Sequence, residues 1–218
     1  MSQAWSFSAI KLFETCPRKY HAEKVLKLYP FQETEHTRYG TEVHKALEDY
    51  VLLGTPLAEG YQKFKRIVDV FVKMPGRKCC ELQMAVNKDK TPVPFLSKDV
   101  WVRGIADLVV VKENKAFVVD YKTGSAKYPD KKQLELMALL VFKHFPDITH
   151  VKAALVFLLH NVVVKAEYKR DDEDKLWEKW EEKSTLLSAA FEHDNWPPKP
   201  NGLCRKWCPV AHCEFQGE

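Results

Sequence analysis

The stretch Val100–Gly124, VWVRGIADLVVVKENKAFVVDYKTG, decides the fold that we predict for this chain. Two apolar, β-branched runs flank the polar break Lys112–Lys115, and this pattern predicts two strands joined by a hairpin turn. Each run carries one carboxylate where an apolar residue is expected, Asp107 in the first and Asp120 in the second. If the turn has two residues, counting outward from it places these two aspartates directly opposite each other.

Opposed side chains in a hairpin lie on one face of the sheet, roughly 4.5–5.5 Å apart, and Lys122 shares the face of Asp120 because side chains alternate. Two carboxylates in such an apolar sheet repel each other and each bears a desolvation cost. A divalent cation between them removes both penalties, and Mg²⁺ typically binds carboxylates together with substrate phosphate. The stretch therefore predicts a metal-dependent phosphodiester-hydrolysing site. A one-residue slip of the register would place the acids on opposite faces.

Length and composition indicate an ordinary globular protein. The chain has 218 residues, 45% of them hydrophobic, with a formal net charge of +4. That charge is mild, so nucleic-acid binding would depend on local basic patches. The sequence has no run of about 18 apolar residues that could span a membrane, and its first residues lack the features of a signal peptide. We therefore expect a protein of the reducing cytoplasm with no membrane partner.

The order of predicted elements indicates one α/β domain over residues 1–218. Residues 1–75 are expected to be helical, with one helix capped by Ser8 and another opening at Gly40-Thr41. Residues 79–170 form the predicted core, in which strands at 79–86, 149–160 and 162–170 join the hairpin and a helix starts near Asp130. Residues 171–193 read as a last helix and residues 194–218 as a cysteine-rich tail. The result is a mixed sheet of about five strands flanked by helices.

Three more polar residues attract attention because of where they stand in these elements. His44 lies in the first turn of a predicted helix, where a histidine serves either packing and capping or metal binding. Glu81 begins a predicted strand, where an acid is commonly solvated. Gln133 lies in the first turns of the helix that follows the hairpin and faces back toward its end.

Six cysteines are present, at positions 16, 79, 80, 204, 208 and 213. In a reducing compartment, clustered cysteines indicate a metal site before disulfides. Cys79 and Cys80 fit buried strand positions and carry no predicted role.

The ordered set of Gly40-x-x-x-His44, the strand acid Glu81, Gly-Ile-Ala-Asp107, Asp120-Tyr-Lys122-Thr-Gly and Gln133-Leu-x-Leu resembles the PD-(D/E)XK nuclease superfamily. The likeness is greatest to its RecB-like exonuclease branch, which includes the RecB and AddB nuclease domains and CRISPR-associated exonucleases. The resemblance covers nearly the whole chain and implies a restriction-endonuclease-like core. One departure is Met137, which stands where the family's glutamine motif usually carries a tyrosine.

The resemblance implies a role for each matched residue. Mg²⁺ or Mn²⁺ would be held by Asp107, Asp120, His44 and the carbonyl of Tyr121. Lys122 would orient or activate the attacking water. Two further residues, Glu81 and Gln133, would support the site or the substrate.

The early Cys16-Pro segment and the tail resemble iron–sulfur members of the same branch. By that resemblance, a [4Fe–4S] cluster would be held by Cys16, Cys204, Cys208 and Cys213, and would join the N- and C-terminal segments. The usual spacing is Cys-x2-Cys-x5-Cys, whereas the tail has Cys-x3-Cys-x4-Cys with the same total span. A tetrahedral Zn²⁺ on these thiolates, or on three of them with His212, is the alternative. Unliganded thiols are the third reading.

The implied activity is a metal-dependent deoxyribonuclease, most simply an exonuclease that acts on linear or single-stranded DNA with little sequence preference. Basic and aromatic residues that suit phosphate or base contacts are Arg18, Lys19, Tyr20, Arg103, Lys127, Lys131 and Lys132. Solvated helix faces explain these basic residues equally well. The alternatives are an inactive DNA- or protein-binding module on the same fold and a structure-specific endonuclease. Recombination or replication proteins in a bacterial or phage-infected cell are the expected partners.

Overall fold

The computed structural model describes residues 4–217, and these fall into two units. One unit runs from Glu33 to Trp177, and the other combines residues 4–32 with the chain from Glu178 onward. The expectation of one domain over residues 1–218 stays a prediction. No helix in the described part of the chain is both long enough and apolar enough to cross a membrane.

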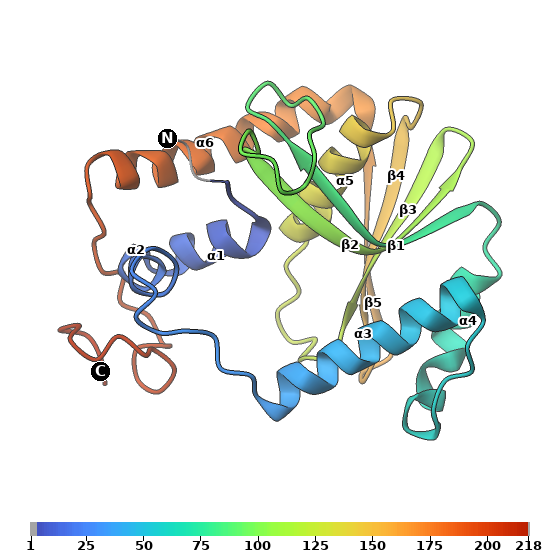
Figure 1. Cartoon of the computed structure of the whole chain (residues 1–218), viewed down its shortest axis with the longest axis horizontal. Coiled ribbons are helices and arrows are strands. Elements are labelled where there is room, and N and C mark those ends of the chain that lie inside the picture. Colours follow the sequence, from blue (N-terminus) through green and yellow to red (C-terminus); the bar gives the residue numbers. More distant parts are fainter. Residues whose placement is uncertain (1–3, 218) are drawn as a thin grey trace. The chain divides into compact units, whose positions relative to one another are not determined.

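A five-stranded mixed sheet forms the centre of the unit Glu33–Trp177 (Figure 1). Its strands, in spatial as well as chain order, are β1 (Arg77–Val86), β2 (Val102–Lys112), β3 (Lys115–Lys122), β4 (His150–Phe157) and β5 (Val162–Lys169). All neighbours pair antiparallel except β3 and β4, which are parallel. The predicted mixed sheet is therefore confirmed.

The hairpin between β2 and β3 has the predicted register. Lys112 pairs with Lys115 across a two-residue turn, and the ladder runs inward to the pair Leu108–Val119. In that register the next row contains Asp107 and Asp120. The first turn residue, Glu113, has a φ of 53°, the left-handed conformation that tight hairpin turns require.

Three α-helices lie wholly within this unit: α3 (Glu35–Leu53), α4 (Lys65–Val72) and α5 (Lys132–His144). A 3₁₀ segment, Glu59–Phe64, precedes α4. The predicted start of α3 at Gly40-Thr41 was wrong, because Thr34 and Thr37 form a reciprocal capping box that begins the helix earlier. A fourth helix, α6 (Glu173–Glu192), begins in this unit.

Helices α3 and α4 cover one face of the sheet and α5 covers the other. The buried cluster under α3 and α4 takes Leu108 and Val110 from β2 and Val119 and Tyr121 from β3. Because side chains alternate, the other face of β3 carries Asp120, which hydrogen-bonds Gln133 of α5. The carboxyl end of β3 is therefore reached by helices from both faces.

Gly104 of β2 lets α5 pack directly on the sheet. A Cβ at this position would lie 2.3 Å from the Met137 Cε and 3.0 Å from the Leu140 Cδ1, both on α5. Gly104 thus meets α5, whereas Leu108, four residues later, packs under α3. Strict alternation would place these two residues on one face, so the alternation of β2 is broken between them. Asp107 lies in that interval.

The other unit contains α1 (Phe7–Thr15), α2 (Pro17–Tyr20), a π-helical turn (His21–Val25), the later part of α6 and the tail. Helix α1 is capped by the Ser6 side chain, which accepts a hydrogen bond from the Ala9 N–H at 3.3 Å, so the predicted cap Ser8 was wrong. The core of this unit is aromatic. Its stacked or edge-on contacts join Phe13, Tyr20, Phe191 and Trp196.

Candidate active site and cysteine pocket

Three carboxylates lie in one row across three adjacent strands. Cys80 pairs with Leu108 and Leu82 with Ala106, so Glu81 of β1 stands opposite Asp107 of β2. The β2–β3 register places Asp120 in the same row on the other side of Asp107. Three carboxylates this close repel one another strongly unless a cation is present.

The backbone at Glu81 has an unusual conformation. Its φ is 45°, inside a strand whose other residues are extended. A left-handed non-glycine residue is strained, and such residues cluster at functional sites. The strain at Glu81 coincides with the broken alternation of β2 opposite it.

His44 of α3 completes a candidate metal group with two of these acids. One ligand atom each from His44, Glu81 and Asp107 all lie within 4.8 Å of one another. The His44 Nδ1 is 3.4 Å from the Asp107 Oδ1. The second oxygen of Asp107 accepts a hydrogen bond from the Tyr121 N–H at 2.6 Å, which fixes the carboxylate. One imidazole nitrogen and carboxylate oxygens suit Mn²⁺ or Mg²⁺.

Asp120, Lys122 and Gln133 form a second, interlocked group. The Lys122 Nζ lies 2.6 Å from the Asp120 Oδ2 and donates to the Gln133 Oε1 at 2.9 Å. The Gln133 Nε2 donates to the Asp120 Oδ1 at 2.5 Å. The buried Asp120 Oδ2 accepts no hydrogen bond of regular geometry despite its ion pair. An oxygen in this condition fits a metal ligand.

The electrostatics of the site are those of crowded acids. Burial raises the pKa of Asp120 to about 6, and the charge of Asp107 adds to this effect, while Lys122 opposes it. Partial burial and then Asp107 raise the pKa of Glu81. Burial alone would lower the pKa of His44, but its hydrogen bond to Asp107 and the surrounding carboxylates raise it overall. The site therefore favours bound positive charge.

An open groove of about 740 Å³ leads to this row of acids. It is lined by residues of α3 between His36 and Glu48, including His44, by Glu81, and by Thr123 and Gly124 after β3. Gly40 lets α3 approach the residue after β3 closely, since a Cβ at this position would lie 3.2 Å from the Thr123 Oγ1.

The sequence reasoning found these residues but not their grouping. It assigned His44, Asp107 and Asp120 to the metal, whereas the group whose ligand atoms lie within 4.8 Å of one another contains His44 and Asp107 together with Glu81. Metal binding by Asp120 stays a prediction. The carbonyl of Tyr121 stays a prediction, and the Tyr121 ring packs edge-on against His44 at 6.2 Å. The missing signal was the β1–β2 register, which depends on a connection from 87 to 101 that the sequence pattern does not fix.

Of the predicted DNA contacts, Tyr20 is corrected by the structure. Its side chain is 2% exposed and stacks on Trp196 at 5.9 Å, which leaves no ring face for a base. Arg18 forms an ion pair with Glu214, and Lys19 lies 3.7 Å from Glu23. Contact of Arg18 and Lys19 with DNA stays a prediction.

The remaining predicted contacts belong to the unit that contains the sheet. Arg103 packs over the Phe95 ring at 5.2 Å. Lys127, Lys131 and Lys132 are exposed on the segment between β3 and the first turn of α5. Their neighbour Tyr128, which the sequence reasoning did not consider, is also exposed.

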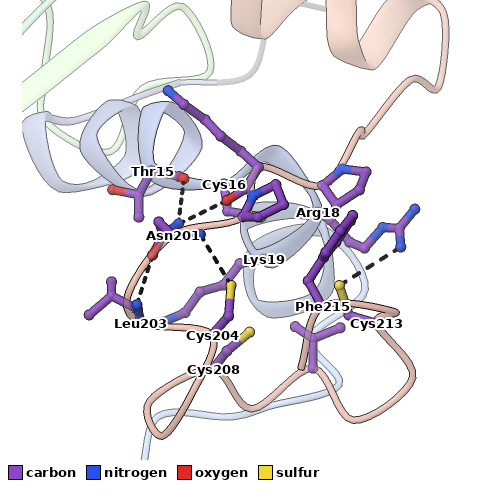
Figure 2. A pocket seen from close by; sticks show the side chains of 14 residues that line it. Thr15, Cys16, Arg18, Lys19, Asn201, Leu203, Cys204, Cys208, Cys213 and Phe215 are labelled. Carbon is purple, nitrogen blue, oxygen red and sulfur yellow. Dashed lines mark hydrogen bonds between the residues drawn. The ribbon is translucent and has the colours of Figure 1, made fainter. Parts of the chain in front are cut away.

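The four predicted cysteine ligands line one small cavity of about 20 Å³ in the other unit (Figure 2). Cys16 follows α1, and Cys204, Cys208 and Cys213 come from the tail. All four are partly buried and none is in a disulfide. The Arg18 Nη1 is 3.9 Å from the Cys213 Sγ.

Hydrogen bonds hold the tail against the end of α1. The Lys199 Nζ donates to the Glu14 carbonyl at 2.7 Å and the Asn201 Nδ2 to the Thr15 carbonyl at 3.2 Å. These carbonyls belong to the last turn of α1, which otherwise leaves them unpaired. The Asn201 N–H donates to the Cys204 Sγ at 3.4 Å, so one asparagine joins both sides of the pocket (Figure 2).

No three of the cysteine sulfurs that the structure describes in this pocket lie within 4.8 Å of one another. Sulfurs that share a tetrahedral Zn²⁺ lie about 3.8 Å apart, given Zn–S bonds of about 2.3 Å. Within residues 4–217, the group of His44, Glu81 and Asp107 is the one set of three or more metal-binding side chains whose ligand atoms all lie within 4.8 Å. Zn²⁺ on the four thiolates, or on three of them with His212, stays a prediction.

Comparison with known proteins gives one family. The model of the PD-(D/E)XK nuclease superfamily matches residues 4–213. A search of curated proteins finds no match.

One solved structure illustrates the likeness in fold, and a second is a weaker match. The crystal structure of a "Putative exonuclease" from Eubacterium rectale has a TM-score of 0.54 and 11% sequence identity, over 94% of this chain and 87% of that one. The crystal structure of SSO0001 has a TM-score of 0.46 and 14% identity, over 99% of this chain and 88% of that one. At 11% identity, the likeness to the Eubacterium rectale structure concerns the fold alone.

Proposed function

The chain belongs to the PD-(D/E)XK nuclease superfamily and is thus a hydrolase of phosphodiester bonds, and from this premise we propose that it is a DNA exonuclease of the RecB-like branch. The observation that carries the proposal is the row of Glu81, Asp107 and Asp120, with His44 above it and Lys122 at its end. An inactive binding module has no need to keep such a repulsive set of charges around the buried Asp120.

The residues of the site divide into two roles. His44, Glu81, Asp107 and Asp120 would hold Mg²⁺ or Mn²⁺, and the bound ion would supply Lewis acidity at the scissile phosphate and acidify a water. Lys122 would place its positive charge beside the attacking water and the phosphate oxygens as negative charge develops there.

Gln133 acts as a positioning residue in this proposal. Its amide bonds both Asp120 and Lys122, so it sets the direction of the carboxylate and of the ammonium group together. The groove lined by α3 and by Thr123 and Gly124 gives a strand of DNA access to these groups.

The test compares linear and covalently closed circular DNA in Mg²⁺ and in Mn²⁺. We expect nucleotides to be released from linear DNA alone, and the variant Asp120→Asn to release none. Nicking or linearisation of the circular DNA would show that the protein is an endonuclease rather than an exonuclease. No metal-dependent cleavage of either substrate by folded protein would reject the nuclease proposal.

We also propose a [4Fe–4S] cluster at Cys16, Cys204, Cys208 and Cys213. The support for this proposal is that the four thiols line one cavity, and four thiolates are the usual complement of such a cluster. Anaerobic purification followed by metal analysis and a visible absorption spectrum tests this. About four irons per chain are expected in the wild-type protein and far fewer in Cys204→Ser. Zinc, or no metal at all, in the wild-type protein would reject the cluster.

A further inference from the structure

The segment between β3 and α5 carries an exposed aromatic ring that the active site described above leaves without a role. Residues 123–131, here called the β3–α5 loop, include Tyr128, whose side chain is 82% exposed. A single exposed ring is common on protein surfaces, so its position relative to the active site decides whether it can contact a ligand.

Both ends of the β3–α5 loop are fixed at the active site. Lys122 precedes the loop and Gln133 follows it, and their side chains hydrogen-bond at 2.9 Å. Tyr128 lies six positions after Lys122, so an extended chain carries it no further than about 20 Å away. Stacked nucleotides are about 3.4 Å apart along a strand, so Tyr128 stays within about six nucleotides of the scissile phosphate.

The loop also carries charge of the sign that a DNA strand requires. Lys127 is exposed and its Nζ lies 5.3 Å from the centre of the Tyr128 ring. Lys131 and Lys132 are exposed at the far end of the loop. A phosphate and its base can therefore meet a lysine and an aromatic ring side by side, the combination that binds single strands.

The local structure restricts the backbone conformation around Tyr128. Pro129 restricts Tyr128 to extended conformations. The Lys127 N–H donates to the Ser125 hydroxyl at 3.2 Å, and the Lys132 N–H donates to the Asp130 carboxylate at 3.1 Å. Less conformational entropy is then lost when a base stacks on the ring.

We propose that Tyr128 stacks on an unpaired base of single-stranded DNA next to the cleavage point, with Lys127 on the adjoining phosphate. This inference rests on the proposed DNA substrate and deepens it, because paired bases in a duplex keep their faces covered. Met137, at the family's usual tyrosine position, is buried against Gly104 and cannot contact DNA.

The experiment measures binding rather than cleavage. Fluorescence anisotropy in EDTA follows three labelled oligonucleotides: a single strand, the same strand with abasic sites throughout, and a blunt duplex. The proteins are the wild-type chain, Tyr128→Ala, Tyr128→Phe and, as a matched control, Phe31→Ala, which removes another exposed ring (79%) outside this loop.

For the intact single strand, we expect Tyr128→Ala to weaken binding about tenfold or more, since stacking on an aromatic ring has about that effect per base. Tyr128→Phe keeps the ring and should stay within about twofold of wild type, as should Phe31→Ala. On the abasic strand and on the duplex, Tyr128→Ala should match wild type within about twofold.

Equal losses on the intact and abasic strands, or no loss on either, would overturn the stacking role, and so would equal losses on single strand and duplex. The result stands apart from catalysis: a protein that binds as expected but cleaves nothing would reject the nuclease proposal and leave the stacking site in place.

Discussion

Replacing Asp120 by asparagine should stabilise the metal-free protein at alkaline pH. Burial and the charge of Asp107 raise the pKa of Asp120 from 3.8 to about 6 in the folded protein. Because the pKa of Asp120 is higher in the folded than in the unfolded protein, protonation of Asp120 stabilises the fold. This stabilisation is fully present at a pH below the unfolded pKa of 3.8 and is lost as the pH rises through about 6. Two pKa units correspond to about 3 kcal/mol, which is the cost of keeping Asp120 ionised at pH 8 without metal.

The amide introduced by this substitution would resemble the neutral acid and would escape that cost. In EDTA at pH 8, Asp120→Asn should therefore unfold with a free energy up to about 3 kcal/mol higher than wild type, a rise in Tm of roughly 6–12 °C for a chain of this size. At pH 4, where Asp120 is largely protonated in the folded state, the two proteins should unfold alike.

Urea and thermal unfolding at pH 4, 6 and 8 would measure this difference. Asp99→Asn, at an exposed loop position, is the control and should change stability by less than about 0.5 kcal/mol at each pH. Adding Mg²⁺ or Mn²⁺ at pH 8 should raise the Tm of wild type more than that of Asp120→Asn. A variant less stable than wild type at pH 8 in EDTA would refute the reasoning.

Three further predictions follow from single contacts. Lys122→Met should lower cleavage at least about a hundredfold while leaving the Tm within a few degrees of wild type, as a kinetic assay with circular dichroism would report. Gly104→Ala should cost about 1–3 kcal/mol in urea unfolding because its Cβ meets Met137, and Met137→Ala in the same protein should recover part of that loss. Arg170→Ala should lower the free energy of unfolding in urea by about 2–4 kcal/mol, because Arg170 donates hydrogen bonds to three backbone carbonyls and to the buried Glu173. A loss under about 0.5 kcal/mol would contradict that role.

Local sequence determined the elements and the central hairpin. Runs of β-branched residues with period two form β2 and β3, and the two-residue turn then leaves one register, so Asp107 and Asp120 had to share a row. The helices followed from apolar spacing, although the Thr34–Thr37 cap of α3 was overlooked and its start was misplaced. These features depend on neighbours within a few residues, which is why the pattern alone reveals them.

Contacts between distant segments were decided by the tertiary structure alone. The register of β1 against β2 placed Glu81 beside Asp107, and α3 brought His44 to the same point. Apolar spacing placed Met137 on the buried face of its helix, but its packing partner, Gly104 of β2, is set by the tertiary structure. Each of these arrangements is selected by the burial of side chains across the whole sheet, a quantity that depends on the positions of all the elements together and has no local period to reveal it.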